Sequence, residues 1–127
     1  MTIEEMLKTN EQFKTKGLLL SPDDLFDRLR LRDDMITESW RLRQEFVLEK
    51  MEMDKKKACR IIELKTVVDD KWKGLTEKVI EWNIKQEFYD DELKLAVKKA
   101  QYELLYERAT AIIDFINVVK LSLKSDL

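Results

Sequence analysis

The sequence predicts an all-α protein, and three observations support this fold class. Glycine occurs twice and proline once in 127 residues, so the chain has few of the residues that favour the tight turns of a multi-stranded sheet. Charged residues make up 39% and apolar residues 44% of the chain, a mixture typical of helices with one charged and one apolar face. Helix-forming residues fill two stretches that contain neither Gly nor Pro, 23–73 and 75–127. We therefore expect a single helical domain spanning 1–127.

The first predicted helix is short and covers residues 2–16. Thr2 is followed three residues later by Glu5, and such a pair forms a capping box that satisfies free amide groups at a helix start. Gly17 suits the position just after a helix end, where a left-handed backbone is common. The sequence therefore predicts both ends of this helix.

The second predicted helix is long and covers residues 22–70. Ser21 is a good N-cap, Pro22 fits the first helical position, and the acidic residues 23–24 complement the helix dipole. Whether 66–74 is helix or loop stays open. The expected apolar face, interrupted by Gln44, Asp54 and Lys65, consists of Trp40, Val47, Met51, Ala58, Ile61 and Val68.

The third predicted helix covers residues 75–124, after a chain reversal at Gly74. Its apolar residues recur in alternating steps of three and four, which is the pattern of a heptad seam. This arrangement favours an antiparallel hairpin of two long helices, with the short first helix folded on one end. The seam consists of Tyr102, Leu105, Ala109, Ile112, Ile116, Val119 and Leu123.

The last helix is also apolar outside that seam, at Val118 and Leu121 for example. A helix that is apolar on two sides is usually buried on both, and other copies of a short chain can supply the cover. We therefore predict a homo-oligomer. The alternative is a monomer in which the first helix and residues 18–20 cover this surface. The predicted interface residues are Leu105, Ile112, Ile113, Phe115, Ile116, Val119 and Leu123.

The composition argues against an enzyme, a metal site and a cofactor site. Histidine is absent and Cys59 is the single cysteine, so the commonest general base and metal ligand are missing and no internal disulfide can form. We expect Cys59 to be partly buried and inert. Charges interrupt the apolar stretch 104–123, which argues against a membrane span. The expected location is the cytoplasm, or the host cytoplasm if the protein is encoded by a phage.

A basic excess lies in the middle of the chain, where residues 40–65 carry eight basic and five acidic side chains. Lysines that face phosphates give salt-dependent binding of nucleic acid, and Trp40 and Trp72 could stack on bases. The alternative is a solvated helix face, some of whose lysines pair with Glu49, Glu52 and Asp54. The candidate nucleic-acid-binding residues are Lys50, Lys55, Lys56, Lys57 and Arg60, with Arg43.

Three segments are similar to one known family. The run from Arg43 to Lys57 resembles the second-helix segment of the UvsY-like recombination mediator proteins of large tailed phages, with its lysine-rich turn followed by Arg60. Residues 2–7 look like the opening of several members. The segment 90–95 with the aliphatic residues that follow it is similar to the family's C-terminal helix.

This resemblance implies an oligomeric, non-enzymatic protein that binds single-stranded DNA and loads a recombinase onto strands covered by a single-strand-binding protein. It also implies that the basic turn contacts phosphates, that Arg43 and Lys50 support it, and that the C-terminal helix holds the oligomer together. The alternative function is a helical structural or adaptor protein of a phage or bacterial assembly, which would form oligomers without binding nucleic acid.

Overall fold

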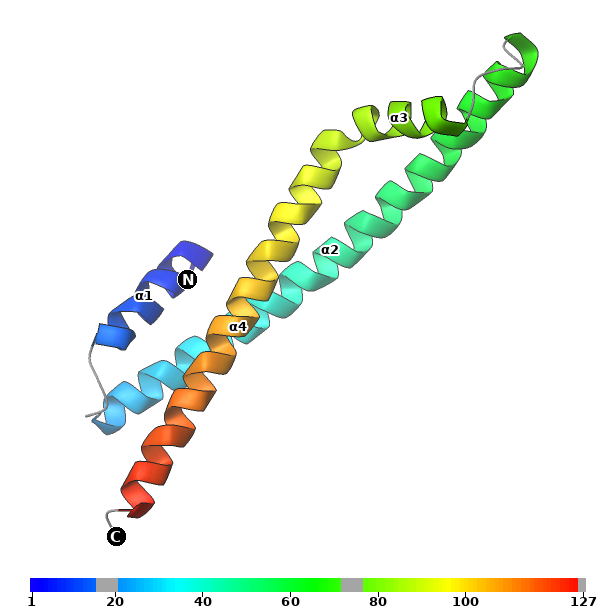
Figure 1. Ribbon diagram of the computed structural model, residues 1–127. Coiled ribbons are helices and arrows are strands. Elements are labelled where there is room, and N and C mark those ends of the chain that lie inside the picture. The colour runs from blue at the N-terminus through cyan, green and yellow to red at the C-terminus, as the bar shows by residue number, and fades with distance from the viewer. Residues whose placement is uncertain (16–20, 72–76, 126–127) are drawn as a thin grey trace. The chain divides into compact units, whose positions relative to one another are not determined.

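A computed structural model describes the backbone of residues 1–15, 21–71 and 77–125, and the side chains of residues 1–13, 21–66 and 77–121 (Figure 1). Within these ranges the chain is helical almost throughout and contains no β-strand. The long helices pack together, and the predicted all-α class is confirmed. The four helices are α1 (Ile3–Thr15), α2 (Pro22–Lys71), α3 (Glu77–Glu87) and α4 (Tyr89–Ser125).

The first two helices begin as their sequences predict. The Thr2 amide donates to Oε2 of Glu5 (3.1 Å), and the Glu5 amide donates to Oγ1 of Thr2 (3.2 Å). The Asp24 amide donates in the same way to Oγ of Ser21 (3.3 Å). These reciprocal contacts fix both helix starts. At its other end α2 stays helical through 66–71, whereas both glycines lie outside the described residues.

The helix predicted over 75–124 is divided at Phe88, so the prediction of one continuous helix there was wrong. The Phe88 amide donates to the Ile84 carbonyl (3.0 Å), and the Phe88 carbonyl accepts from the Glu92 amide (2.9 Å). Helical hydrogen bonding therefore reaches Phe88 from both sides. The acidic residues 90–92 stand in the first turn of α4, where negative charge favours a helix N-terminus.

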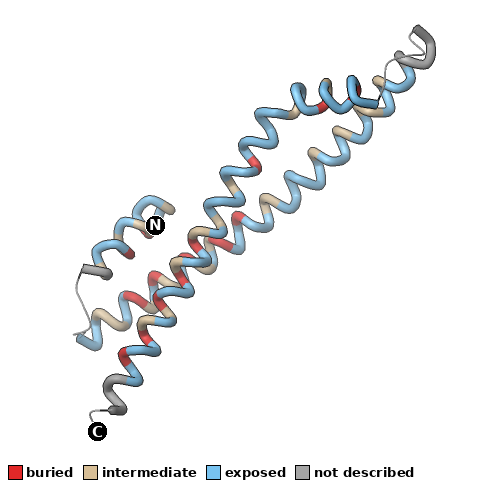
Figure 2. The backbone as a smooth tube through the Cα atoms, in the orientation of Figure 1, coloured by how far each residue is buried: buried red, intermediate tan, exposed pale blue. Residues whose placement is uncertain are grey.

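Two compact units make up the chain. The first combines residues 1–43 with 100–127, and the second consists of residues 44–99. Most of the buried residues in Figure 2 belong to the first unit. We call these parts unit 1 and unit 2 and describe each by itself.

Unit 1 contains the apolar core. Met35 and Leu105 have no exposed surface, and Ala109 is also fully enclosed. The α4 seam predicted from Tyr102 to Val119 is confirmed, because its members are buried or half-buried, whereas the side chain of Leu123 is not described. The core cluster consists of Met6 from α1, Leu31, Met35 and Leu42 from α2, and Leu105, Ala109, Ile112 and Ile116 from α4.

The buried face of α2 differs from the prediction. Its buried residues in unit 1 follow steps of three and four through Leu31, Met35, Ser39 and Leu42. A polar residue inside this pattern hides it in the sequence. The Ser39 hydroxyl donates to the Tyr102 carbonyl (2.9 Å), which satisfies the buried group. The face predicted to be apolar and buried is largely exposed at Trp40, Val47, Met51 and Ala58.

Arg28 is a buried cation that joins all three helical segments of unit 1. It is 4% exposed, and its Nη2 donates to the Phe13 carbonyl near the end of α1 (2.7 Å). Its guanidinium lies 4.3 Å from the ring centroid of Phe115 in α4 and 5.1 Å from that of Phe13. Burial lowers the pKa of Arg28, and the carboxylate of Asp24 partly offsets this effect. The cation–π contacts thus offset part of the lost hydration, while Nε is buried without a hydrogen-bond partner among the described residues.

Truncation of Leu105 tests the unit 1 core. Leu105→Ala is expected to lower the free energy of unfolding by about 2–5 kcal/mol, because it leaves a cavity where no surface was exposed. Leu93→Ala is the matched control, since Leu93 lies on the same helix and is 53% exposed. Urea unfolding followed by circular dichroism measures both. Equal losses for the two variants would contradict the assignment of the core.

A second substitution tests the attachment of α1. Arg28→Lys keeps the charge but removes the planar group that stacks on two rings, so we expect a loss of about 1–3 kcal/mol. Amide hydrogen exchange should show that α1 loses protection before the other helices do. Arg30→Lys serves as the control because Arg30 is exposed. Unchanged protection of α1 in the Arg28 variant would show that the apolar contacts of α1 are sufficient.

Candidate nucleic-acid interface

The basic residues of α2 in unit 2 differ in whether their charges are already compensated. Lys50 and Lys55 are exposed and make no ion pair with any residue that the structure describes. Arg43 belongs to unit 1, where it ends the segment 1–43. It is also exposed and makes no ion pair with a described residue. These three cations are therefore available to an anionic ligand.

Lys56 makes only a weak ion pair. Its Nζ lies 3.5 Å from Oε1 of Glu52, one helical turn away, and both side chains are about two-thirds exposed. Exposed pairs of this kind contribute little to stability because water and salt screen them. Lys56 thus remains accessible to a ligand at small cost.

Lys57 is engaged across the helices. Its ammonium forms an ion pair with Glu92 in the first turn of α4. The same Nζ lies 5.8 Å from the ring centroid of Phe88, the residue at the bend between α3 and α4. The Lys57 side chain is 21% exposed. Its charge is therefore held inside unit 2 rather than presented to solvent.

Arg60 is the most strongly engaged member of the cluster. Its Nε lies 3.1 and 2.9 Å from the two carboxylate oxygens of Glu87, and its Nη2 lies 3.0 Å from Oε1 of the same residue. Its Nη1 contacts Glu63 at 3.0 Å. Hydrogen bonds to Glu87 and then to Glu63 raise the pKa of Arg60 above its ordinary value. All three guanidinium nitrogens thus contact one of two carboxylates, although the side chain stays 40% exposed.

A third cross-helix pair was not anticipated from the sequence. Lys98 of α4 contacts Glu49 at 2.7 Å and Glu45 at 3.3 Å on α2. The hydrogen bond to Glu49 is the main cause that raises the pKa of Lys98. Glu49 was expected to pair with a lysine of α2 itself, whereas it forms its ion pair with Lys98 of α4. No local sequence signal identifies a partner 49 residues away.

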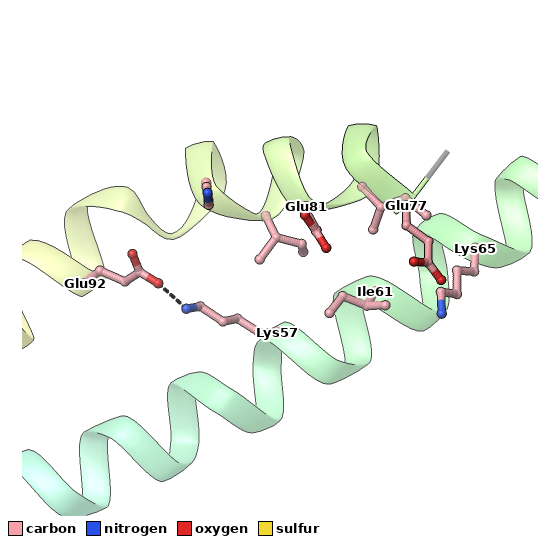
Figure 3. Close-up of a pocket in the computed structure, with 9 residues that line it drawn as sticks. Lys57, Ile61, Lys65, Glu77, Glu81 and Glu92 are labelled. Atoms are coloured by element: carbon pink, nitrogen blue, oxygen red, sulfur yellow. Dashed lines mark hydrogen bonds and ion pairs between the residues drawn. The ribbon is translucent and has the colours of Figure 1, made fainter. Parts of the chain in front are cut away.

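An open hollow of about 460 Å³ lies beside the Lys57–Glu92 pair (Figure 3). Ile61 lines it from α2, and the buried residues Ile80 and Ile84 line it from α3. Figure 3 also shows Glu77, Glu81 and Lys65 around it. Charges of both signs surround an apolar floor, and no nucleophile with an adjacent base is present among its lining residues. The hollow therefore offers no recognisable catalytic arrangement.

Two other sequence predictions concern single side chains. Cys59 is exposed, so the expectation that it is partly buried was wrong, because the stretch of α2 around it packs through a different face. Trp40 is 61% exposed and could contact a base, whereas Trp72 lies outside the described residues. Base stacking on these two rings stays a prediction.

The predicted oligomer interface falls largely on the core of unit 1. Leu105, Ile112, Ile116 and Val119 are buried within the chain, Ile113 and Phe115 are half-buried, and the side chain of Leu123 is not described. These positions therefore have partners without a second copy. Val118 and Leu121 of the same helix are 50% and 64% exposed. The homo-oligomer stays a prediction. In it, a second copy would cover the exposed surface at Val118 and Leu121.

Neither a metal centre nor a membrane-spanning segment emerges from the part of the chain that the structure describes. Its His, Cys, Asp and Glu side chains form no group of three suited to a metal ion, and none of its helices is long and apolar enough to cross a membrane. No family model matches the chain, and no significant match was found among curated proteins or solved structures.

Proposed function

We propose that this protein is a non-enzymatic, single-stranded DNA-binding protein that acts as a homo-oligomer. The observation that carries the proposal is the set of exposed lysines Lys50, Lys55 and Lys56 on α2. Two of them have no ion pair among the described residues, and the third has a weak one. Such cations release counterions from the phosphate backbone and give affinity that does not depend on base sequence.

The resemblance to UvsY-like proteins extends this proposal to a role in recombination and repair. In that role the protein would bind strands covered by a single-strand-binding protein and help to load a recombinase, without making or breaking a covalent bond. The basic segment supplies the DNA contacts in this account. The protein partners rest on the family resemblance alone.

The proposal includes an antiparallel hairpin of the two long helices. Its support is the order of the ion pairs in unit 2. Positions 45–49 of α2 pair with Lys98, position 57 pairs with Glu92, and position 60 pairs with Glu87. Partner numbers fall as α2 numbers rise, as expected when neighbouring segments run in opposite directions.

Removal of the accessible lysines tests DNA binding directly. The variant K50A/K55A/K56A is expected to bind a labelled single-stranded oligonucleotide at least about tenfold more weakly at low salt. The slope of log affinity against log salt should shrink by about 2, because each lost phosphate contact removes about 0.7. Fluorescence anisotropy measures both quantities.

The matched control is K78A/K94A/K99A, which removes three exposed lysines from α3 and α4 of the same unit. It changes the net charge equally but leaves the α2 cluster intact. We expect this variant to lose less affinity for the oligonucleotide and to keep nearly the same slope of log affinity against log salt. Equal losses in the two variants would show that net charge, rather than the α2 cluster, governs binding.

A second function, the helical adaptor, is favoured by the apolar residues that α2 exposes. Val47, Leu48, Met51 and Ile62 are between 46% and 67% exposed in unit 2. Exposed apolar surface of this kind commonly marks a protein interaction site. An adaptor would form assemblies without affinity for nucleic acid, so absence of oligonucleotide binding even at low salt would favour it over the first function.

The oligomer has its own test. Sedimentation equilibrium of the wild-type protein is expected to show more than one copy per particle. Val118→Glu should dissociate the oligomer while helicity by circular dichroism is retained, because Val118 is half exposed on the predicted surface and a buried carboxylate is costly. Phe26→Glu is the control on α2, since Phe26 is 68% exposed and lies outside both proposed surfaces. A wild-type monomer at all concentrations would refute the oligomer in both functions.

A further inference from the structure

Two cations of the predicted phosphate-binding turn are held by carboxylates at one bend. Lys57 and Arg60 are three residues apart on α2. Their partners are Glu92, in the first turn of α4, and Glu87, the last residue of α3. Phe88 lies between these helices and also approaches Lys57. The α3–α4 bend therefore presents two anions to the same turn that DNA would use.

The contact geometry is the one that a phosphate would adopt. Arg60 faces both oxygens of Glu87 with two nitrogens, at 2.9–3.1 Å. A guanidinium binds carboxylate and phosphate through the same planar fork of N–H groups. Because these N–H groups already donate to Glu87, they cannot bind a phosphate at the same time. The two anions are thus alternative ligands of Nε and Nη2, while Nη1 contacts Glu63 on α2 itself.

The internal pairs are accessible enough to be exchanged. The side chains of Arg60 and Glu87 are each 40% exposed. In the other pair Glu92 is 47% exposed, whereas Lys57 is 21% exposed. Ion pairs at this level of exposure are weak. The described part of unit 2 buries few apolar side chains, namely Ile80, Ile84 and Leu95. Little packing therefore opposes separation of these charges when a polyanion competes for them.

We propose that Glu87 and Glu92 are built-in competitors of nucleic-acid phosphate, so that unit 2 withholds Arg60 and Lys57 until bound DNA displaces the two carboxylates. This inference rests on the proposed DNA-binding function and adds an autoinhibitory contact to it. Lys50, Lys55 and Lys56 make the first contact with DNA, and Arg60 and Lys57 add to it once the carboxylates are displaced.

The test removes the two competing charges and keeps their shape. E87Q/E92Q is expected to bind a labelled single-stranded oligonucleotide about two- to thirtyfold more tightly than the wild type, because two exposed pairs no longer have to be broken. The matched control is E77Q/E81Q, which removes two carboxylates from α3 that are not partners of Arg60 or Lys57 among the described contacts. Circular dichroism verifies that each variant is folded.

A double-mutant cycle separates competition from a change in net charge. In a protein that already carries K57A/R60A, E87Q/E92Q should no longer increase the affinity for the oligonucleotide. The two cations that these substitutions would release are absent there. A gain of equal size in E77Q/E81Q, or a gain that persists without Lys57 and Arg60, would overturn the autoinhibitory contact and leave the proposed function intact. Absence of binding by the wild type and by every variant at low salt would overturn both.

Discussion

The apolar contact around Met35 of α2 and Leu105 of α4 is the interaction on which unit 1 depends. Both side chains are fully enclosed, and burial of such a side chain stabilises a fold by about 1.5–3 kcal/mol. The same core receives Met6 from α1, and Arg28 secures that helix through the Phe13 carbonyl. This core therefore holds α1, α2 and α4 together within unit 1.

Unit 2 is held together by a different balance of forces. Its helices are joined by a few buried apolar side chains and by charge pairs at Lys57, Arg60 and Lys98. Such charge pairs weaken with salt. Regions with few buried apolar contacts open more readily than a core does. The cations suited to phosphate therefore lie in the unit whose contacts are the easier to exchange. This division gives the proposed ligand access without requiring the core of unit 1 to open.

Features set by neighbouring residues could be predicted from the sequence, and features set by distant partners could not. The helix starts at Thr2 and Ser21 depend on contacts three residues apart, and the α4 seam is an uninterrupted apolar pattern. The buried face of α2 was missed because Ser39 stands in it and its partner is a carbonyl 63 residues away. The bend at Phe88 involves neither Gly nor Pro, so no residue marks it.

Distant partners also determine which lysines are free to bind a ligand, and the sequence could not show this. Lys55 and Lys57 are the same residue type two positions apart, and only the residues that face them, Glu92 and Phe88 beside Lys57, distinguish them. On α2, Lys55 follows exposed Met51 by one turn, so a phosphate bound by Lys55 in the proposed function would bring the nucleotide close to apolar surface. Unpaired bases can contact such a surface, whereas bases in a duplex are stacked and shielded. A preference for single strands would therefore arise from the apolar neighbours of these lysines, since the charges alone recognise only the backbone.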